Sequence, residues 1–432
     1  MANDVPTIQG DMARAVIDPA SYADWDNLLN TFDDIRSTSP VTKVLPDDEG
    51  IFDPFWLVTG YDEVMQISKD NATFLNNPRT VVFSLTEGIE FAKAMTGGSP
   101  HMVASLVTFD APIHMKYRKL TQEWFMPKNL RGIEDEIRAI AQDTVQRLID
   151  AGPETDFVPL VSAPYPLHVV MQILGVPEED EPRMLMLTQQ LFGGQDEDLN
   201  HSGMKDMTAE QITQLVAGAV KDFESYFAKL TAEKRANPTG DVASTIANAA
   251  VDGEPLNDRD MMGYYIIVAA AGHDTTSAST AGAMLALARD PEQFARVKAD
   301  RSLLAGIVEE AIRWTSPVQH FMRTAAEDVE IGGQKIAKGD WLMINYVAAN
   351  HDPAQFDDPR RFDAARSPNR HLAFGAGAHQ CLGLHLARLE MRILFETLLD
   401  RVEAVELAGE PARSKSTFVG GLKTLPLRIT TV

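Results

Sequence analysis

Cys381, the only cysteine in the chain, lies in the glycine-rich segment "AFGAGAHQCLGLHL". Gly375, Gly377 and Gly383 lie on either side of it, and His379 precedes it by two residues. Glycines allow a backbone to pass close to a bulky group, and the N–H groups at the start of a helix stabilise a thiolate. A lone cysteine is most often a small buried apolar residue, but these surroundings favour a nucleophile or a metal ligand.

A second set of polar residues interrupts an apolar helix. The segment "AAGHDTTSAS" contains Gly272, Asp274, Thr275 and Thr276, in the middle of a buried helix that the sequence predicts over residues 257–290. These residues form helices poorly, and their side chains compete for backbone hydrogen bonds, so they can open the helix locally. An acid beside an alcohol can relay protons. The alternative is a kinked helix whose polar groups satisfy one another.

Other charged residues are ordinary when taken one by one. Glu310 and Arg313 are three residues apart on a predicted helix, which alone is typical of a surface ion pair. His114 and Arg118 fall one turn apart if their segment is helical. An arginine such as Arg118 suits carboxylate binding, because its planar fork meets both oxygens.

The pattern Phe374-x-x-Gly377-x-His379-x-Cys381-x-Gly383 resembles the haem-binding loop of the cytochrome P-450 monooxygenases. In that family the cysteine is the proximal ligand of the haem iron, and its thiolate favours O–O cleavage. The resemblance therefore implies haem (heme b, iron protoporphyrin IX) with Cys381 as axial thiolate, Phe374 packed beside the haem and His379 near a propionate. The residues that it places against the haem are His114, Arg118, Ala271, Gly272, Arg323, His371, Phe374, Gly375, His379, Cys381 and Gly383.

The same resemblance implies roles for the other polar residues. The family's distal groove, which receives dioxygen, matches the segment around Gly272, and Asp274 and Thr275 are its expected proton relay. His273 is expected to be a hydrogen-bonded helix residue and not an iron ligand. A buried structural triad, in which the charges satisfy one another, is expected from Glu310, Arg313 and Arg361.

The periodicity of the chain predicts a fold that is mainly α with a minor β part. Residues 133–149 have helical spacing, whereas 329–347 and the final "LPLRITTV" are typical of short strands. Residues 347–372 form a long irregular segment, which is usually functional. We expect one cytochrome P-450 domain over residues 1–432, with a long central helix over the haem, an N-terminal extension of about 20 residues and no fused reductase.

Composition excludes several classes of protein. The formal net charge of −23 disfavours a nucleic-acid binder, which would need a basic surface. The apolar run "YYIIVAAAG" at 264–272 is too short to span a bilayer, and the N-terminus has no signal-peptide pattern. One cysteine excludes an internal disulfide and fits a reducing compartment. We expect a soluble, cytoplasmic, monomeric protein that binds no membrane.

The segments expected to line the substrate pocket are apolar, which favours a small neutral hydrophobic ligand. Within the family, "YPLHVVMQILGVPEEDEP", "AGHDTTS" and "FVGG" are similar to the bacterial subgroup that hydroxylates α-terpineol. This likeness suggests a monoterpenoid or an alkyl-aromatic hydrocarbon as the substrate. The expected pocket residues are Met102, Leu106, Leu191, Phe192, Val268, Ala271, Val318, Phe321 and Phe418.

The resemblance also implies a redox partner, because no segment is expected to form a flavin or nicotinamide domain. Electrons would come from a [2Fe-2S] ferredoxin served by a separate ferredoxin reductase. The sequence therefore predicts a monooxygenase that inserts one atom of O2 into a C–H bond. The alternatives are a peroxygenase driven by hydrogen peroxide and a non-catalytic haem-binding sensor. The hypothesis for ferredoxin docking is a basic patch of Lys116, Lys119, Lys128, Arg131, Arg388 and Arg392.

Overall fold

The computed structural model describes residues 5–46, 52–192, 195–196 and 209–432, with the backbone alone for residues 189–192 and 209–216. Helices make up most of the described chain. They are α1 (Gly10–Ile17), α2 (Trp25–Thr38), α3 (Tyr61–Lys69), α4 (Thr86–Thr96), α5 (Ile113–Gln122), α6 (Pro127–Leu130), α7 (Glu134–Asp150), α8 (Pro164–Leu174), α9 (Glu181–Phe192), α10 (Ala209–Ala236), α11 (Val242–Ala247), α12 (Asp258–Ala271), α13 (Asp274–Arg289), α14 (Pro291–Ala299), α15 (Leu304–Thr315), α16 (Tyr346–Asn350) and α17 (Leu384–Arg401).

The strands form one larger sheet and several small ones. The six-stranded sheet has the order β1 (Thr7–Ile8), β2 (Val41–Val44), β3 (Phe55–Val58), β11 (Trp341–Asn345), β8 (His320–Ala325) and β4 (Phe74–Leu75). The three-stranded sheet has the order β12 (Val402–Leu407), β15 (Pro426–Thr431) and β5 (Glu154–Asp156). The two-stranded pairs are β6 (Ala250–Val251) with β7 (Glu254–Pro255), β9 (Val329–Ile331) with β10 (Gln334–Ile336), and β13 (Ala412–Arg413) with β14 (Leu422–Thr424).

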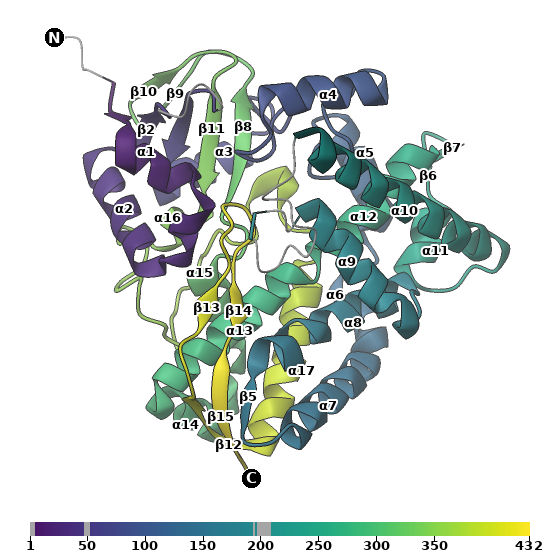
Figure 1. Ribbon diagram of the computed structural model, residues 1–432, viewed down its shortest axis with the longest axis vertical. Helices are drawn as coiled ribbons and strands as arrows, with labels where there is room; N and C mark the ends of the chain where they lie inside the picture. Colours follow the sequence, from purple (N-terminus) through teal and green to yellow (C-terminus); the bar gives the residue numbers. More distant parts are fainter. Residues whose placement is uncertain (1–4, 47–51, 193–194, 197–208) are drawn as a thin grey trace.

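The larger sheet lies with α1, α2, α3 and α16 on one side of the molecule, and most of the other helices fill the remaining part (Figure 1). Buried apolar side chains of α8, α12, α13, α15 and α17 form the largest core cluster. The predicted helix over 133–149 is α7, and the strands predicted near 329–347 and at the C-terminus are present. The expected N-terminal extension is part of the packed structure from Thr7 onward, because β1 pairs with β2. No helix in the described ranges has the length and apolar character of a membrane span.

The long helix predicted over 257–290 is two helices. Asn257 caps α12 as its side chain accepts a hydrogen bond from Asp260 N, but α12 ends at Ala271 and α13 begins at Asp274. Thr275 Oγ1 donates to Ala271 O over 3.0 Å, which is the local competition that opens a helix. Gly272 lies at the break, where a Cβ would meet Val170 Cγ2 of α8 at 2.6 Å. The break therefore depends on polar side chains and on close packing against α8.

The expected triad has a different third member. Glu310 and Arg313 are both fully buried, with 0% of each side chain exposed, and Arg313 Nη2 donates to Glu310 Oε1 over 2.8 Å. Arg366 Nε donates to the same carboxylate over 3.0 and 3.1 Å. Arg361 was predicted wrongly, since it contributes only its backbone oxygen, which accepts from Arg366 Nη2 over 3.0 Å. The path of the irregular segment after α16 decides which arginine reaches the buried acid.

Three histidines outside the lining of the main cavity make the fold sensitive to acid. Burial lowers the pKa of His101 and His320 to about 4 and that of His351 to about 3. In an unfolded chain the pKa of a histidine is about 6.5, which is higher than these folded values. At a pH between the folded and the unfolded pKa, the unfolded chain therefore binds more protons than the folded chain. Stability is therefore full above about pH 6.5 and falls as the pH drops towards 4, by up to about 1.4 kcal/mol per pH unit for each histidine.

We expect this loss in urea unfolding curves recorded between pH 7 and pH 5. The variant His351→Phe removes one of the three groups, so its free energy of unfolding should depend less steeply on pH than that of the wild type. Equal slopes for the two proteins would show that His351 is not held in its neutral form.

Candidate active site

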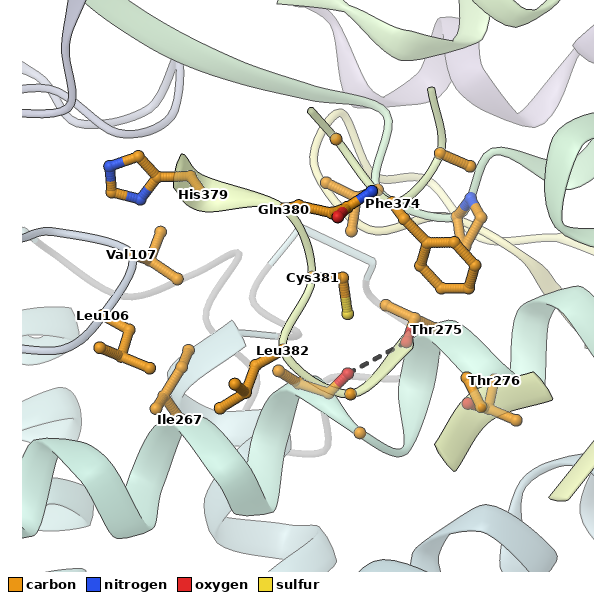
Figure 2. A pocket seen from close by; sticks show the side chains of 18 of the residues that line it. Leu106, Val107, Ile267, Thr275, Thr276, Phe374, His379, Gln380, Cys381 and Leu382 are labelled. Atoms are coloured by element: carbon orange, nitrogen blue, oxygen red, sulfur yellow. Dashed lines mark hydrogen bonds between the residues drawn. The ribbon is translucent and has the colours of Figure 1, made fainter. Parts of the chain in front are cut away.

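A cavity of about 280 Å³ lies between the break of α12 and α13 and the loop that carries Cys381. Figure 2 shows the sulfur of Cys381 pointing into this space, with Thr275 on the opposite side and Leu382 and Ile267 nearby. Every residue expected to contact the haem lines the cavity, with the exception of His371. Residues separated by more than 250 positions in the sequence therefore surround one interior space.

The cysteine loop is a tight turn that presents a thiol. Cys381 N donates to Phe374 O over 2.8 Å, which closes the turn. Gly377 has φ +72°, and a Cβ there would meet Ser68 O at 2.5 Å, so this position requires glycine. The sulfur is accessible from the cavity although it lies inside the protein, and burial raises the pKa of Cys381. The N–H of Gly383 and the guanidinium of Arg118 oppose that rise, and a bound metal ion would deprotonate the thiol outright.

The opposite wall holds the acid and the alcohol. Thr275 Oγ1 gives its proton to Ala271 O (dashed line in Figure 2), which leaves the oxygen lone pairs free for another donor. Asp274 has 43% of its side chain exposed and lies 3.2 Å from Nε2 of the buried His273. His273 Nδ1 has no hydrogen-bond partner among the described residues. Asp274 therefore lies at the cavity wall, one residue from the Thr275 hydroxyl.

Four basic side chains gather at one end of the cavity. The rings of His114 and His379 stack with their centroids 3.8 Å apart, and Asn76 Nδ2 lies 2.9 Å from His379 Nε2. Burial, followed by the neighbouring cations, lowers the pKa of His379 to about 2, and burial and Arg118 lower that of His114 to about 4. Burial also lowers the pKa of Arg118 and Arg323.

This cluster fits the two propionates of a haem. Arg118 and Arg323 form no ion pair with any described carboxylate, and His114 Nδ1 is buried without a partner. A buried guanidinium without a counter-ion is costly, so the half-buried Arg118 and the buried Arg323 favour an anionic group at this end of the cavity. The residues present therefore fit a haem: Cys381 would hold its iron, and this cluster would hold its propionates.

Some predicted site residues lie elsewhere. His371 lies behind the cavity lining, with its Nε2 3.2 Å from Glu309 Oε2 and its Nδ1 accepting from Ala373 N over 3.3 Å, and its contact with haem stays a prediction. Met102 is half-buried outside the cavity lining, and its place in the substrate pocket stays a prediction. Leu191 and Phe192 end α9, and their side chains lie outside the described part of the chain.

The structure also adds residues that sequence reasoning missed. Glu390 of α17 is buried at the cavity wall, where Thr276 Oγ1 donates to its Oε1 over 3.0 Å. Burial raises the pKa of Glu390 well above its ordinary value. A signal existed in the sequence, since Glu390 interrupts the apolar face of the helix between Leu386 and Ile393. Asn76, in contrast, lies on an irregular segment with no distinguishing pattern.

Comparisons with known proteins identify the family of the chain. The family profile for cytochrome P450 matches residues 89–430. The chain is 44% identical to cytochrome P450-terp of Pseudomonas sp, over 98% of each chain, and 33% identical to linalool 8-monooxygenase of Pseudomonas putida, over 88% of this chain and 90% of that one. The crystal structure of CYP108D1 from Novosphingobium aromaticivorans DSM12444 superposes with a TM-score of 0.92 at 65% identity, over 99% of this chain and all (100%) of that one. These matches confirm the predicted fold, and the chain belongs to the cytochrome P450 family, the monooxygenases that hold haem on a cysteine thiolate.

Proposed function

We propose that this monooxygenase hydroxylates a small apolar compound, a monoterpenoid or an alkyl-aromatic hydrocarbon, with electrons from a ferredoxin. The observation that carries the proposal is the placement of Cys381 and Thr275 on opposite sides of one interior cavity. Cys381 would hold the iron, and His114, Arg118, Arg323 and His379 would hold the propionates. When bound there, haem supplies the activation of O2 and the transfer of one oxygen atom.

The lining of the cavity supports an apolar substrate. Six residues predicted to contact the substrate lie in its wall: Leu106, Val268, Ala271, Val318, Phe321 and Phe418. None of these side chains carries a charge or a hydrogen-bonding group, so binding depends on shape and on the removal of apolar surface from water. The names of the relatives, P450-terp and linalool 8-monooxygenase, agree with a terpenoid.

A screen of monoterpenoids and alkylbenzenes against the haem-loaded protein tests the proposal. We expect several of them to change the optical spectrum of the ferric haem, and we expect the product of turnover under 18O2 to contain one labelled oxygen atom. Turnover driven by hydrogen peroxide but not by a reduced ferredoxin would favour the peroxygenase. Binding and reduction without oxidation of any compound would favour the sensor.

The chain's own residues can control protons at this site. The Thr275 hydroxyl already donates to Ala271 O, so it can accept a hydrogen bond from a water molecule held in the cavity. The Asp274 carboxylate also lines the cavity and can pass protons to that water. The apolar part of the lining limits the water that can enter, which reduces uncontrolled delivery of protons.

The variant Thr275→Ala is expected to bind substrate with unchanged affinity while the yield of product per electron falls about tenfold or more. Without the hydroxyl, protons are delivered without control and the electrons leave as hydrogen peroxide. The measurement is the ratio of product to electrons consumed, together with the peroxide formed. Thr275→Ser keeps the hydroxyl and should retain most of the coupling. Full coupling in Thr275→Ala would contradict the relay.

Ion pairs within the chain occupy several members of the basic patch that was predicted to dock a ferredoxin. Arg388 Nη2 donates to Glu309 over 2.8 Å, and Lys116 Nζ lies 2.5 Å from Asp252. Arg392 pairs with two glutamates of α7 and α17. Among the described residues, the members of the predicted patch that are exposed and without a carboxylate partner are Lys119, Lys128 and Arg131. We propose that these three attract an acidic ferredoxin.

The charge reversal Lys119→Glu is expected to slow reduction by ferredoxin at low ionic strength, by about tenfold, because steering depends on opposite charge. The difference should vanish at high salt, where exposed charges are screened. Lys335→Glu, the same change on the distant β10, serves as the control. Unchanged kinetics for Lys119→Glu in stopped-flow measurements at low salt would remove the proposed surface.

A further inference from the structure

His320, the first residue of β8, has a buried imidazole that joins three segments of the chain. Its side chain is 0% exposed. Its Nδ1 lies 2.8 Å from Thr417 O, and its Nε2 accepts a hydrogen bond from Val82 N over 3.0 Å. Burial lowers the pKa of His320 to about 4, so the ring is neutral near pH 7. A neutral imidazole has one donor and one acceptor, and these two bonds fix Nδ1 as the donor.

The chain neighbours of His320 and Thr417 line the cavity. Phe321 follows His320 on β8, and Phe418 follows Thr417 at the tip of the β13–β14 hairpin. The rings of Phe321 and Phe418 pack edge to face, with centroids 5.4 Å apart and planes at 65°. The imidazole therefore lies directly behind an aromatic wall of the cavity. His320 is adjacent in the chain to Phe321, and its bonding partner Thr417 is adjacent to Phe418.

The hairpin tip has other bonds to Gln319, the residue before β8, and these bonds act on the backbone of the hairpin. Gln319 N donates to Phe418 O over 2.8 Å, and Gln319 Nε2 donates to Ser416 O over 2.6 Å. His320 adds the bond to Thr417 O and reaches beyond the hairpin to Val82, in the segment that leads into α4. Among the side chains described, the imidazole of His320 on β8 is the one that bonds both to this hairpin tip and to Val82.

We propose that His320 is a positioning residue, which holds Phe418 at a fixed spacing from Phe321 so that the two rings form a wall that recognises an aromatic ring of the substrate. The proposal rests on the proposed function, because it takes this cavity as the substrate site. Edge-to-face contacts between rings are worth about 0.5–1.5 kcal/mol beyond the area they bury. A ligand with a planar ring gains these contacts only while the wall keeps its geometry.

The test compares how tightly two iron ligands of different size bind to the haem-loaded protein. Imidazole is small, whereas 4-phenylimidazole carries a second ring into the cavity, and both change the optical spectrum of the haem without turnover. In His320→Ala we expect the dissociation constant of 4-phenylimidazole to rise roughly two- to tenfold, with that of imidazole unchanged. In Phe418→Leu the loss should be similar, and adding His320→Ala to it should cause little further change, because the two act through one contact.

Two conservative variants separate the bonds of the imidazole. An asparagine amide lies near the position of Nδ1, so His320→Asn can keep the bond to Thr417 O and should restore most of the affinity for 4-phenylimidazole. A glutamine amide lies nearer the position of Nε2, so His320→Gln can keep the bond from Val82 N and should restore less. His351→Ala is the matched control, since His351 is also buried but contacts Trp25 away from the cavity.

The proposal is overturned if His320→Ala leaves 4-phenylimidazole unaffected, if it weakens both ligands equally, or if His351→Ala has the same effect. It is also overturned if His320→Asn is no better than His320→Ala. These results do not depend on turnover. A wild-type protein that binds both ligands and shows the predicted differences, but oxidises no hydrocarbon, would contradict the proposed function and leave the role of His320 standing.

Discussion

The variant Cys381→Ala is expected to lose the strongly red-shifted Soret band of the reduced carbon monoxide complex and all measurable monooxygenase activity. The chain has no second cysteine to replace the thiolate, and the electron density that sulfur gives to iron is what favours O–O cleavage. Among the described residues there is no other cluster of three or more histidine, cysteine or acidic side chains that could hold a metal ion. Optical spectra of the reduced protein under carbon monoxide measure this effect directly.

Two controls separate loss of the ligand from loss of the fold. Cys381→Ser has nearly the same size but a poorer ligand atom, so it should also lack the red-shifted band. Thermal unfolding of both variants without haem should match that of the wild type, because the sulfur faces the cavity and packs little. Retention of the band in Cys381→Ala would show that another residue binds the iron.

The variant Glu310→Ala is expected to lower the free energy of unfolding by about 3–5 kcal/mol. Glu310 accepts hydrogen bonds from Arg313, Arg366, Asn369 Nδ2 and the backbone N of Asp363. Removing the carboxylate leaves the fully buried guanidinium of Arg313 without its counter-ion, and it frees the irregular segment before the cysteine loop. Urea unfolding of the haem-loaded protein measures the change in stability.

Arg361→Ala is the matched control for that prediction. Its side chain is exposed, and its backbone oxygen, which the substitution retains, makes the contacts to Arg313 and Arg366. We expect a change within about 0.5 kcal/mol, as for ordinary surface substitutions. Arg366→Ala should destabilise far more than Arg361→Ala, and equal effects of the two would contradict the pairing of Glu310 with Arg366.

Features that depend on near neighbours in the chain could be predicted from the sequence. The cysteine turn requires glycine at Gly377 and is followed by a helix, and both are properties of adjacent residues. His114 and Arg118 share a helix face because they are four residues apart on α5. The weak point of the central helix was visible in Gly272 and Thr275, since a hydroxyl competes for a backbone carbonyl within one turn.

The partners of charged and polar side chains in different segments were decided by the tertiary structure. Arg366 replaces Arg361 beside Glu310, and His371 binds Glu309 instead of lining the cavity, although the sequence offers no reason to prefer either. The bonds of His320 to Val82 and Thr417 join positions 238 and 97 residues away. Local spacing determines which face of a helix or turn a residue occupies, whereas a bond between distant segments also depends on the path of the irregular chain between them. Burial increases the effect of each such bond on stability, because a buried charge or imidazole without a bonding partner costs free energy.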